Sequence, residues 1–113
     1  MNTNKLTIKS QEALQQAQLL AQSYGHAQIE NEHLFQAILE TDENVAPFLL
    51  KKLNVNVGLL RQILDRTLQS FAKVSGTEVM FSRTTAATLN EAEIIARKRN
   101  DEYIAIEHLI LAL

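Results

Sequence analysis

The sequence predicts an all-α protein built from two pseudo-symmetric repeats of one helical motif. The first reason is an internal repeat at an offset of 75 positions: Ile-Glu-Asn-Glu-His-Leu at 29–34 returns as Ile-Ala-Ile-Glu-His-Leu at 104–109. The second is that apolar residues recur with the helical period and not with the alternation of strands. The third is that only three glycines and one proline are present to interrupt helices.

The first repeat is expected to contain four helices. Thr7 is the predicted N-cap of the first helix, which runs to about Ser23 and ends at Gly25, because glycine enters the left-handed conformation without steric cost. A second helix is expected over about residues 31–40, a third after an Asn44 cap and a fourth after an Asn56 cap. The second helix is expected to bury Leu34, Phe35, Ile38 and Leu39. The third carries the apolar residues Phe48, Leu49 and Leu53, and the fourth should point Leu60, Ile63, Leu64 and Leu68 inward.

The second repeat follows the first as far as its second helix. Ser82 takes the place of Thr7 as N-cap, and Asn100-Asp101 replaces Gly25-His26 at the turn. The sixth helix is expected to start near Ile106. The fifth helix should bury Leu89, Ala92, Ile95 and Ala96.

This arrangement predicts one domain over residues 1–113. It consists of repeat 1 at about 6–70, a linker at about 70–80 that contains Gly76, and a partial repeat 2 at about 81–113. Counterparts of the third and fourth helices are missing from repeat 2, so we expect a fragment of a longer protein.

Composition excludes several classes of function. A net charge of −2 provides no bulk attraction to nucleic acid or to a membrane surface. The absence of cysteine excludes a disulfide scaffold and a thiolate zinc site, and it fits a reducing, cytoplasmic compartment. No apolar run approaches the roughly 20 residues of a membrane span, and the polar stretch 1–5 is unlike a secretory signal.

The Glu-His pairs at 32–33 and 107–108 are the candidate metal-binding or acid–base groups. Adjacent helical side chains point about 100° apart and do not converge on one ion, and the H-E-x-x-H spacing is absent. The favoured interpretation places each Glu in a first helical turn, with each His packed or hydrogen-bonded between the repeats. Capping likewise explains Thr7 and Ser82 without a nucleophilic role. We therefore predict no catalytic residue, no metal site and no cofactor, and instead a module that binds another chain.

Residues 6–39 and 81–113 resemble a known family. They read LTIKSQEALQQAQLLAQSYGHAQIENEHLFQAIL and FSRTTAATLNEAEIIARKRNDEYIAIEHLILAL. These stretches closely resemble the N-terminal repeat domain of the Clp AAA+ chaperones. The Q-x-A-L-x-x-A-Q and I-E-x-E-H-L motifs are most similar to the ClpB disaggregase branch.

The resemblance implies a fold of two four-helix repeats and a non-enzymatic role. In the family, the domain sits on a flexible linker above a homohexameric AAA+ ring and captures unfolded or aggregated polypeptides for ATP-driven threading and refolding. ATP and Mg belong to AAA+ modules outside this sequence, and ClpB-like rings work with the DnaK chaperone system. The alternative is an adaptor-docking N-domain of a Clp protease ATPase subunit.

The resemblance also implies site residues. The family's substrate-contact positions fall on Thr7, Asp101 and Glu107. An apolar groove of the family falls on Leu89, Glu91, Ile95 and His108. Because Glu91 and His108 stand where some members have leucine, this groove is expected to be more polar than theirs. The substrate-binding set predicted for this chain is Thr7, Leu89, Ile95, Asp101, Glu107 and His108.

Overall fold

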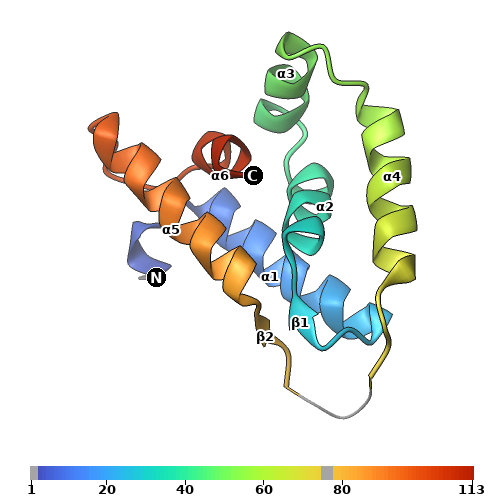
Figure 1. Ribbon diagram of the computed structural model, residues 1–113. Coiled ribbons are helices and arrows are strands. Elements are labelled where there is room, and N and C mark those ends of the chain that lie inside the picture. Colours follow the sequence, from blue (N-terminus) through green and yellow to red (C-terminus); the bar gives the residue numbers. More distant parts are fainter. Residues whose placement is uncertain (1–2, 75–77) are drawn as a thin grey trace.

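The computed structural model describes residues 3–74 and 78–113, and these residues are mainly helical (Figure 1). A single 3-10 turn at Thr3–Lys5 is followed by α1 (Ile8–Tyr24), β1 (Gln28–Ile29), α2 (Asn31–Thr41), α3 (Val45–Lys52), α4 (Val57–Ser70), β2 (Met80–Phe81), α5 (Arg83–Lys98) and α6 (Ile106–Ala112). The predicted all-α class is confirmed, and the helices begin and end close to the predicted residues. Residues 75–77 of the predicted linker, including Gly76, lie outside the described residues.

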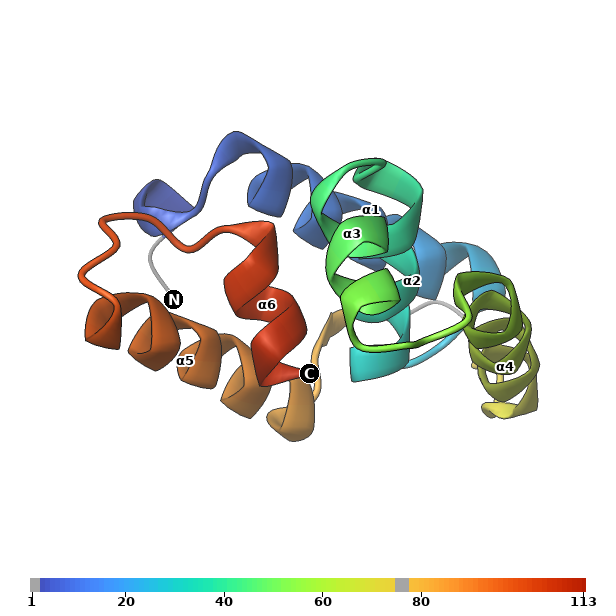
Figure 2. The same ribbon diagram turned by 90° about the horizontal axis from the view of Figure 1, so that it is seen from above.

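Small side chains let the helices of each repeat approach closely. Ala13, Ala17 and Ala21 are fully buried on the face of α1 that lies against α2. In the second repeat, Ala92 and Ala96 of α5 are buried as well, and α5 lies against α6 (Figure 2). Because alanine projects only one carbon, the larger side chains of α2 and α6 fill the space between the helices.

The two repeats are joined by strand pairs that the sequence did not predict. β1 and β2 are parallel, with Ile29 opposite Phe81, and an isolated parallel bridge joins Leu6 to Ile104. At the offset of 75 positions, Leu6 corresponds to Phe81 and Ile29 to Ile104. Rotation about an internal two-fold axis therefore places each of these two strand pairs on the other. Two main-chain hydrogen bonds show the same symmetry, from the Thr7 N–H to the Ile104 oxygen and from the Ser82 N–H to the Ile29 oxygen, both 3.1 Å.

The predicted helix caps of α1, α4 and α5 are confirmed. The side-chain oxygens of Thr7, Asn56 and Ser82 each accept a hydrogen bond of 3.1 Å from a first-turn N–H of the following helix. Gly25 ends α1 with φ of 75°, and its equivalent Asn100 follows α5 with φ of 59°. Asparagine is one of the few residues other than glycine that adopt this left-handed conformation readily, so both repeats use the same turn.

The predicted cap of α3 is wrong. Asn44 itself has a helical backbone conformation and makes no capping hydrogen bond with its side chain. The buried carboxylate of Asp42 caps instead, accepting from the Ala46 N–H at 2.6 Å and from the Asn44 N–H at 3.3 Å. A charged acceptor at a helix N-terminus is favoured by the helix dipole.

The predicted inward face of α4 is partly wrong, and two apolar residues at α3 are exposed. Phe48 and Leu53 are 60% and 64% exposed, and Ile63 is 48% exposed. On α3, Ala46 and Leu50, one helical turn apart, face the core. On α4 the core face follows Leu60, Leu64 and Leu68, which leaves Ile63 on its edge.

Candidate functional site

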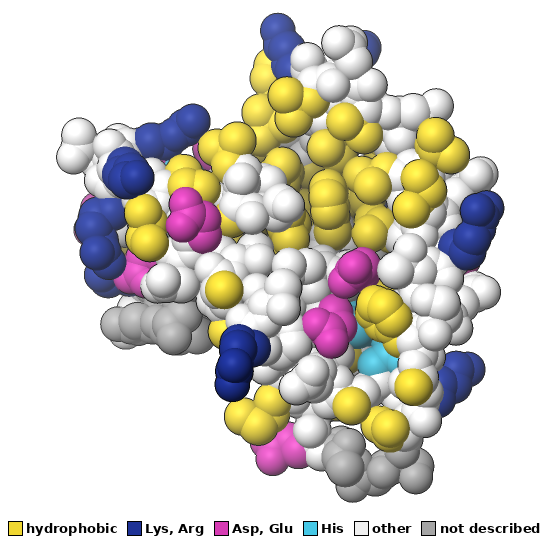
Figure 3. Space-filling view, in the orientation of Figure 1, with side chains coloured by type: hydrophobic (Ala, Val, Ile, Leu, Met, Phe, Trp, Pro, Cys, Tyr) yellow, Lys and Arg dark blue, Asp and Glu magenta, His cyan; other side chains and the backbone are white. Residues whose placement is uncertain are grey.

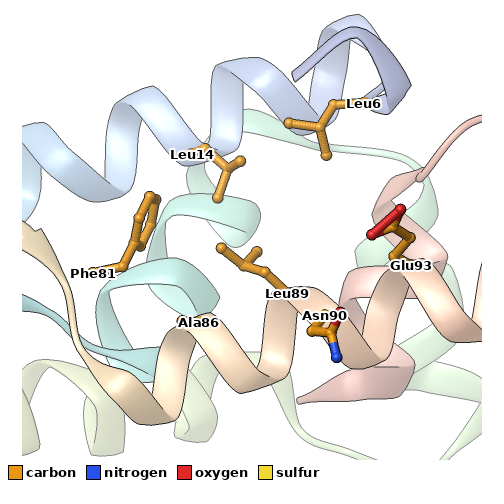
Figure 4. Close-up of a pocket in the computed structure, with 7 residues that line it drawn as sticks. All are labelled: Leu6, Leu14, Phe81, Ala86, Leu89, Asn90 and Glu93. Atoms are coloured by element: carbon orange, nitrogen blue, oxygen red, sulfur yellow. The ribbon is translucent and has the colours of Figure 1, made fainter. Parts of the chain in front are cut away.

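A groove lies between α1 and α5, the first helices of the two repeats (Figure 4). Its volume is about 260 Å³, and its lining residues are Leu6, Leu14, Phe81, Ala86, Leu89, Asn90 and Glu93. Leu6 and Leu89 are buried, whereas Phe81 is 39% exposed. Leu14 and Leu89 point toward one another from the two helices.

The groove lies where the internal two-fold axis brings equivalent residues together. Leu6 and Phe81 occupy equivalent positions in the two repeats, as do Leu14 and Leu89. The segment that precedes each first helix is held by its strand pair with the other repeat. The apolar lining is therefore a product of the duplication, since neither repeat provides it alone.

Glu93, the charged residue at the groove rim, already forms ion pairs with two cations. The Glu93 carboxylate lies 3.1 Å from the Arg97 guanidinium and 3.8 Å from the Lys5 ammonium. The mouth of the groove consequently presents apolar side chains beside a neutralised carboxylate. Such a surface suits an apolar side chain better than an ion.

Of the predicted site residues, only Leu89 lines this groove. Thr7 caps α1 next to the bridge at Ile104, and Ile95 is partly buried on α5. Glu107 lines a separate hollow between α3 and α6. Sequence reasoning did not place Leu6, Leu14 and Phe81 in the groove, although their pairing at the repeat offset was the available signal.

Asp101 and His108 are brought together. The Asp101 carboxylate is about half exposed, and its Oδ2 accepts a hydrogen bond of 2.8 Å from Nε2 of His108, which is 2% exposed. Nδ1 of His108 accepts a hydrogen bond of 2.8 Å from the Ala105 N–H. These two bonds fix the tautomer of the neutral ring, with its proton on Nε2.

The first repeat contains the same arrangement with different chemistry. Nδ1 of His33 accepts from the Glu30 N–H at 2.8 Å, and its Nε2 lies 2.7 Å from Nδ1 of His26, the residue equivalent to Asp101. Burial, and to a smaller extent the neighbouring His26, lower the pKa of His33 to about 4. Burial also lowers the pKa of His26, against an opposing effect of the Leu68 carbonyl. His33 and His108 form hydrogen bonds as expected, but their partners lie in the same repeat and not across the boundary between the repeats.

Two features were not found among the described residues. Residues 3–74 and 78–113 contain no group of three or more His, Cys, Asp or Glu side chains that could hold a metal ion. No helix in the part of the chain that the structure describes is long and apolar enough to cross a membrane.

The fold and the groove define a duplicated helical binding domain. The chain belongs to the family of Clp repeat (R) N-terminal domains, whose sequence pattern matches residues 5–113. Chaperone protein ClpB of Porphyromonas gingivalis is 39% identical over 113 residues, which are 100% of this chain and 13% of that protein. Chaperone protein ClpB of Bacteroides thetaiotaomicron is also 39% identical over 113 residues, and the chain spans 13% of the length of each of these two relatives.

Solved structures show the same fold. The N-terminal domain of the ClpV1 ATPase from E. coli superposes with a TM-score of 0.89 at 25% identity, covering 97% of this chain and 68% of that one. A ClpV N-domain in complex with a VipB peptide gives a TM-score of 0.82 at 22% identity, with coverage of 96% and 67%.

Proposed function

We propose that this chain is the substrate-capturing N-terminal domain of a ClpB-type disaggregase. In this proposal, apolar segments of unfolded or aggregated polypeptides bind in the groove between α1 and α5 and are passed to the AAA+ ring. The observation that carries the proposal is the apolar lining contributed by two pairs of equivalent residues, with Phe81 exposed at its edge. Unfolded chains expose the apolar side chains that such a lining would remove from water.

The size of the groove argues for weak binding. A volume of about 260 Å³ accommodates one or two side chains and not a folded surface. Burying one apolar side chain is worth about 1.5–3 kcal/mol, whereas millimolar affinity corresponds to about 4 kcal/mol. Weak capture suits a domain that must release its polypeptide for threading.

The remaining predicted site residues extend the proposed contact surface. Thr7, Ile95 and Glu107 are proposed contacts for the polypeptide on either side of the groove. Asp101 offers a half-exposed carboxylate to the polypeptide's N–H groups or cations. His108 is buried, so its proposed role is to hold Asp101 in position through the Nε2 hydrogen bond.

The proposed setting is the one that the ClpB relatives suggest. The longer protein would be a cytoplasmic homohexamer that binds ATP and Mg in its AAA+ modules and cooperates with the DnaK system. The peptide bound to a ClpV N-domain supports the idea that this fold has a surface able to hold a polypeptide segment.

The experiment is a fluorescence anisotropy titration of this chain into a labelled, permanently unfolded polypeptide. We expect saturable binding that Phe81→Ser weakens by about tenfold, because burial of one ring is removed. Ile95→Asp should also weaken it. Leu19→Ser, which changes a 57% exposed leucine of α1 outside the groove lining, is the matched control and should bind normally.

Two results would contradict the proposal. One is the absence of saturable binding up to about millimolar concentration, the weakest range worth calling specific. The other is equal affinity of Phe81→Ser and Leu19→Ser. Tight binding to a folded adaptor, with indifference to unfolded chains, would favour adaptor docking instead.

A further inference from the structure

An apolar stripe of α3 is partly exposed to solvent. Val45, Phe48 and Leu49 recur at helical spacing on one side of α3, and Leu53 follows the helix. Val45 and Leu49 also pack against the core. Phe48 and Leu53 are 60% and 64% exposed, although both are large hydrophobic residues. Exposure of such neighbouring side chains on one helix indicates a surface that another chain covers.

A hollow lies beside this stripe, between α3 and α6. Its volume is about 560 Å³, and its lining residues are Glu43, Asn44, Val45, Phe48, Leu49, Arg99 and Glu107. Figure 3 shows hydrophobic side chains gathered over α3 and below it, with Lys or Arg side chains at the outer end of the helix. The surface therefore combines a projecting ring with an adjoining depression.

Charge is divided between the two ends of α3. Glu43 precedes its N-terminus, and Glu107 of α6 lines the same hollow, where Arg99 adds one positive charge. Lys51 and Lys52 lie in the last turn of α3, with the Lys52 ammonium 5.4 Å from the centre of the Phe48 ring. The α3 surface is thus acidic at its beginning and basic at its end.

We propose that α3 pairs two molecules of this chain about a two-fold axis. The two α3 helices lie antiparallel, Phe48 of each molecule enters the hollow of the other, and the basic end of one helix faces the acidic end of its partner. A two-fold interface must be self-complementary, and this surface carries both the ring and the hollow, and both signs of charge. The antiparallel arrangement also opposes the two helix dipoles favourably.

This pairing is separate from the proposed binding of polypeptides in the groove. The groove lies between α1 and α5, and none of its lining residues belongs to α3. Glu107, by contrast, lines the hollow and is covered in the pair. Pairing therefore leaves the groove open and removes one proposed polypeptide contact.

The test is sedimentation equilibrium over a range of concentrations. We expect the average mass to rise from the monomer value of 12.7 kDa toward twice that value. Phe48→Ser should raise the dimer dissociation constant by more than about 100-fold, because two buried rings are lost per dimer. Leu19→Ser, at an exposed leucine of α1, is the control and should pair like the unmodified chain.

Charge reversal tests the antiparallel geometry. Lys52→Glu and Glu43→Lys should each raise the dissociation constant by about tenfold, since each places like charges opposite one another twice. The double variant Glu43→Lys/Lys52→Glu should restore pairing, because the two reversed charges face each other across the axis.

Three results would overturn the proposal. They are a single 12.7 kDa species at about millimolar concentration, a dimer that Phe48→Ser leaves intact, and a double variant that pairs no better than the single ones. Circular dichroism of each variant separates loss of pairing from loss of folding.

Discussion

Acidification should destabilise this domain through His33. The ring is fully buried, and its pKa is about 4 in the folded chain against 6.5 for an ordinary histidine. The unfolded state therefore binds a proton first as the pH falls. The stability that His33 contributes as a neutral ring is complete above about pH 6.5 and is lost progressively between about pH 6.5 and 4.

The magnitude follows from the size of the shift. Each unit of pKa difference corresponds to about 1.4 kcal/mol, so at pH 5 the folded state should lose about 2 kcal/mol relative to pH 7.5. His26 should add to this loss, because burial lowers its pKa as well. The measurement is urea unfolding followed by circular dichroism at the two pH values.

The variant His33→Asn isolates this contribution. The asparagine Oδ1 can take the place of Nδ1 as acceptor for the Glu30 N–H, but the side chain does not titrate. We expect lower stability at pH 7.5 and a loss on acidification that is smaller by about 2 kcal/mol. Leu34→Val, at the neighbouring buried position, is the control and should lower stability equally at both pH values. Equal pH dependence of His33→Asn and the unmodified chain would refute the reasoning, as would an NMR titration that gives His33 a pKa above 6.

Two further predictions concern turns and caps, and thermal unfolding measures both. Gly25→Ala should lower the free energy of unfolding by about 1 kcal/mol, because φ of 75° disfavours any Cβ. Asn100→Gly at the equivalent turn should change it by less than about 1 kcal/mol. Equal losses of stability in the two variants would contradict this prediction. Asp42→Ala should cost about 1–2 kcal/mol, because it leaves the buried N–H of Ala46 without its acceptor. Asp42→Asn keeps an oxygen and should cost less, and an Asp42→Ala protein of unchanged stability would disprove the capping role.

Local signals in the sequence predicted most of the helices. Thr7 and Ser82 are capping residues at equivalent positions, and Gly25 and Asn100 tolerate the left-handed turn, so the ends of α1 and α5 follow from neighbouring residues alone. Helical periodicity then predicted most of the buried residues of α2 and α5, because the apolar residues of each helix recur on one face.

Errors arose where tertiary contacts decide between equivalent local choices. Asn44 and Asp42 are both good capping residues, and the buried Asp42 carboxylate accepts from the Ala46 N–H in the folded chain. Ile63 was predicted to point inward from α4 but is 48% exposed. The sequence shows that α3 is rich in apolar residues, but it does not show which of them face solvent.

The groove was predicted only through Leu89. The two-residue strands are too short to produce an alternating pattern, and their partners lie far away in the sequence, so the position of Phe81 beside Leu14 had no local signal. The repeat offset was the information that linked these residues. Pairing each groove residue with its equivalent would have recovered the lining, because the groove lies on the internal axis.

The reciprocal strand pairs make each repeat depend on the other for its backbone hydrogen bonds. Each repeat completes a backbone pairing that begins in the other, at Leu6 with Ile104 and at Ile29 with Phe81. A single repeat on its own would expose the unpaired edges of both segments, a known cause of aggregation. A repeat without its partner in the same chain would need a second molecule to cover those edges. Here both repeats belong to one chain, so each edge finds its partner within the same molecule.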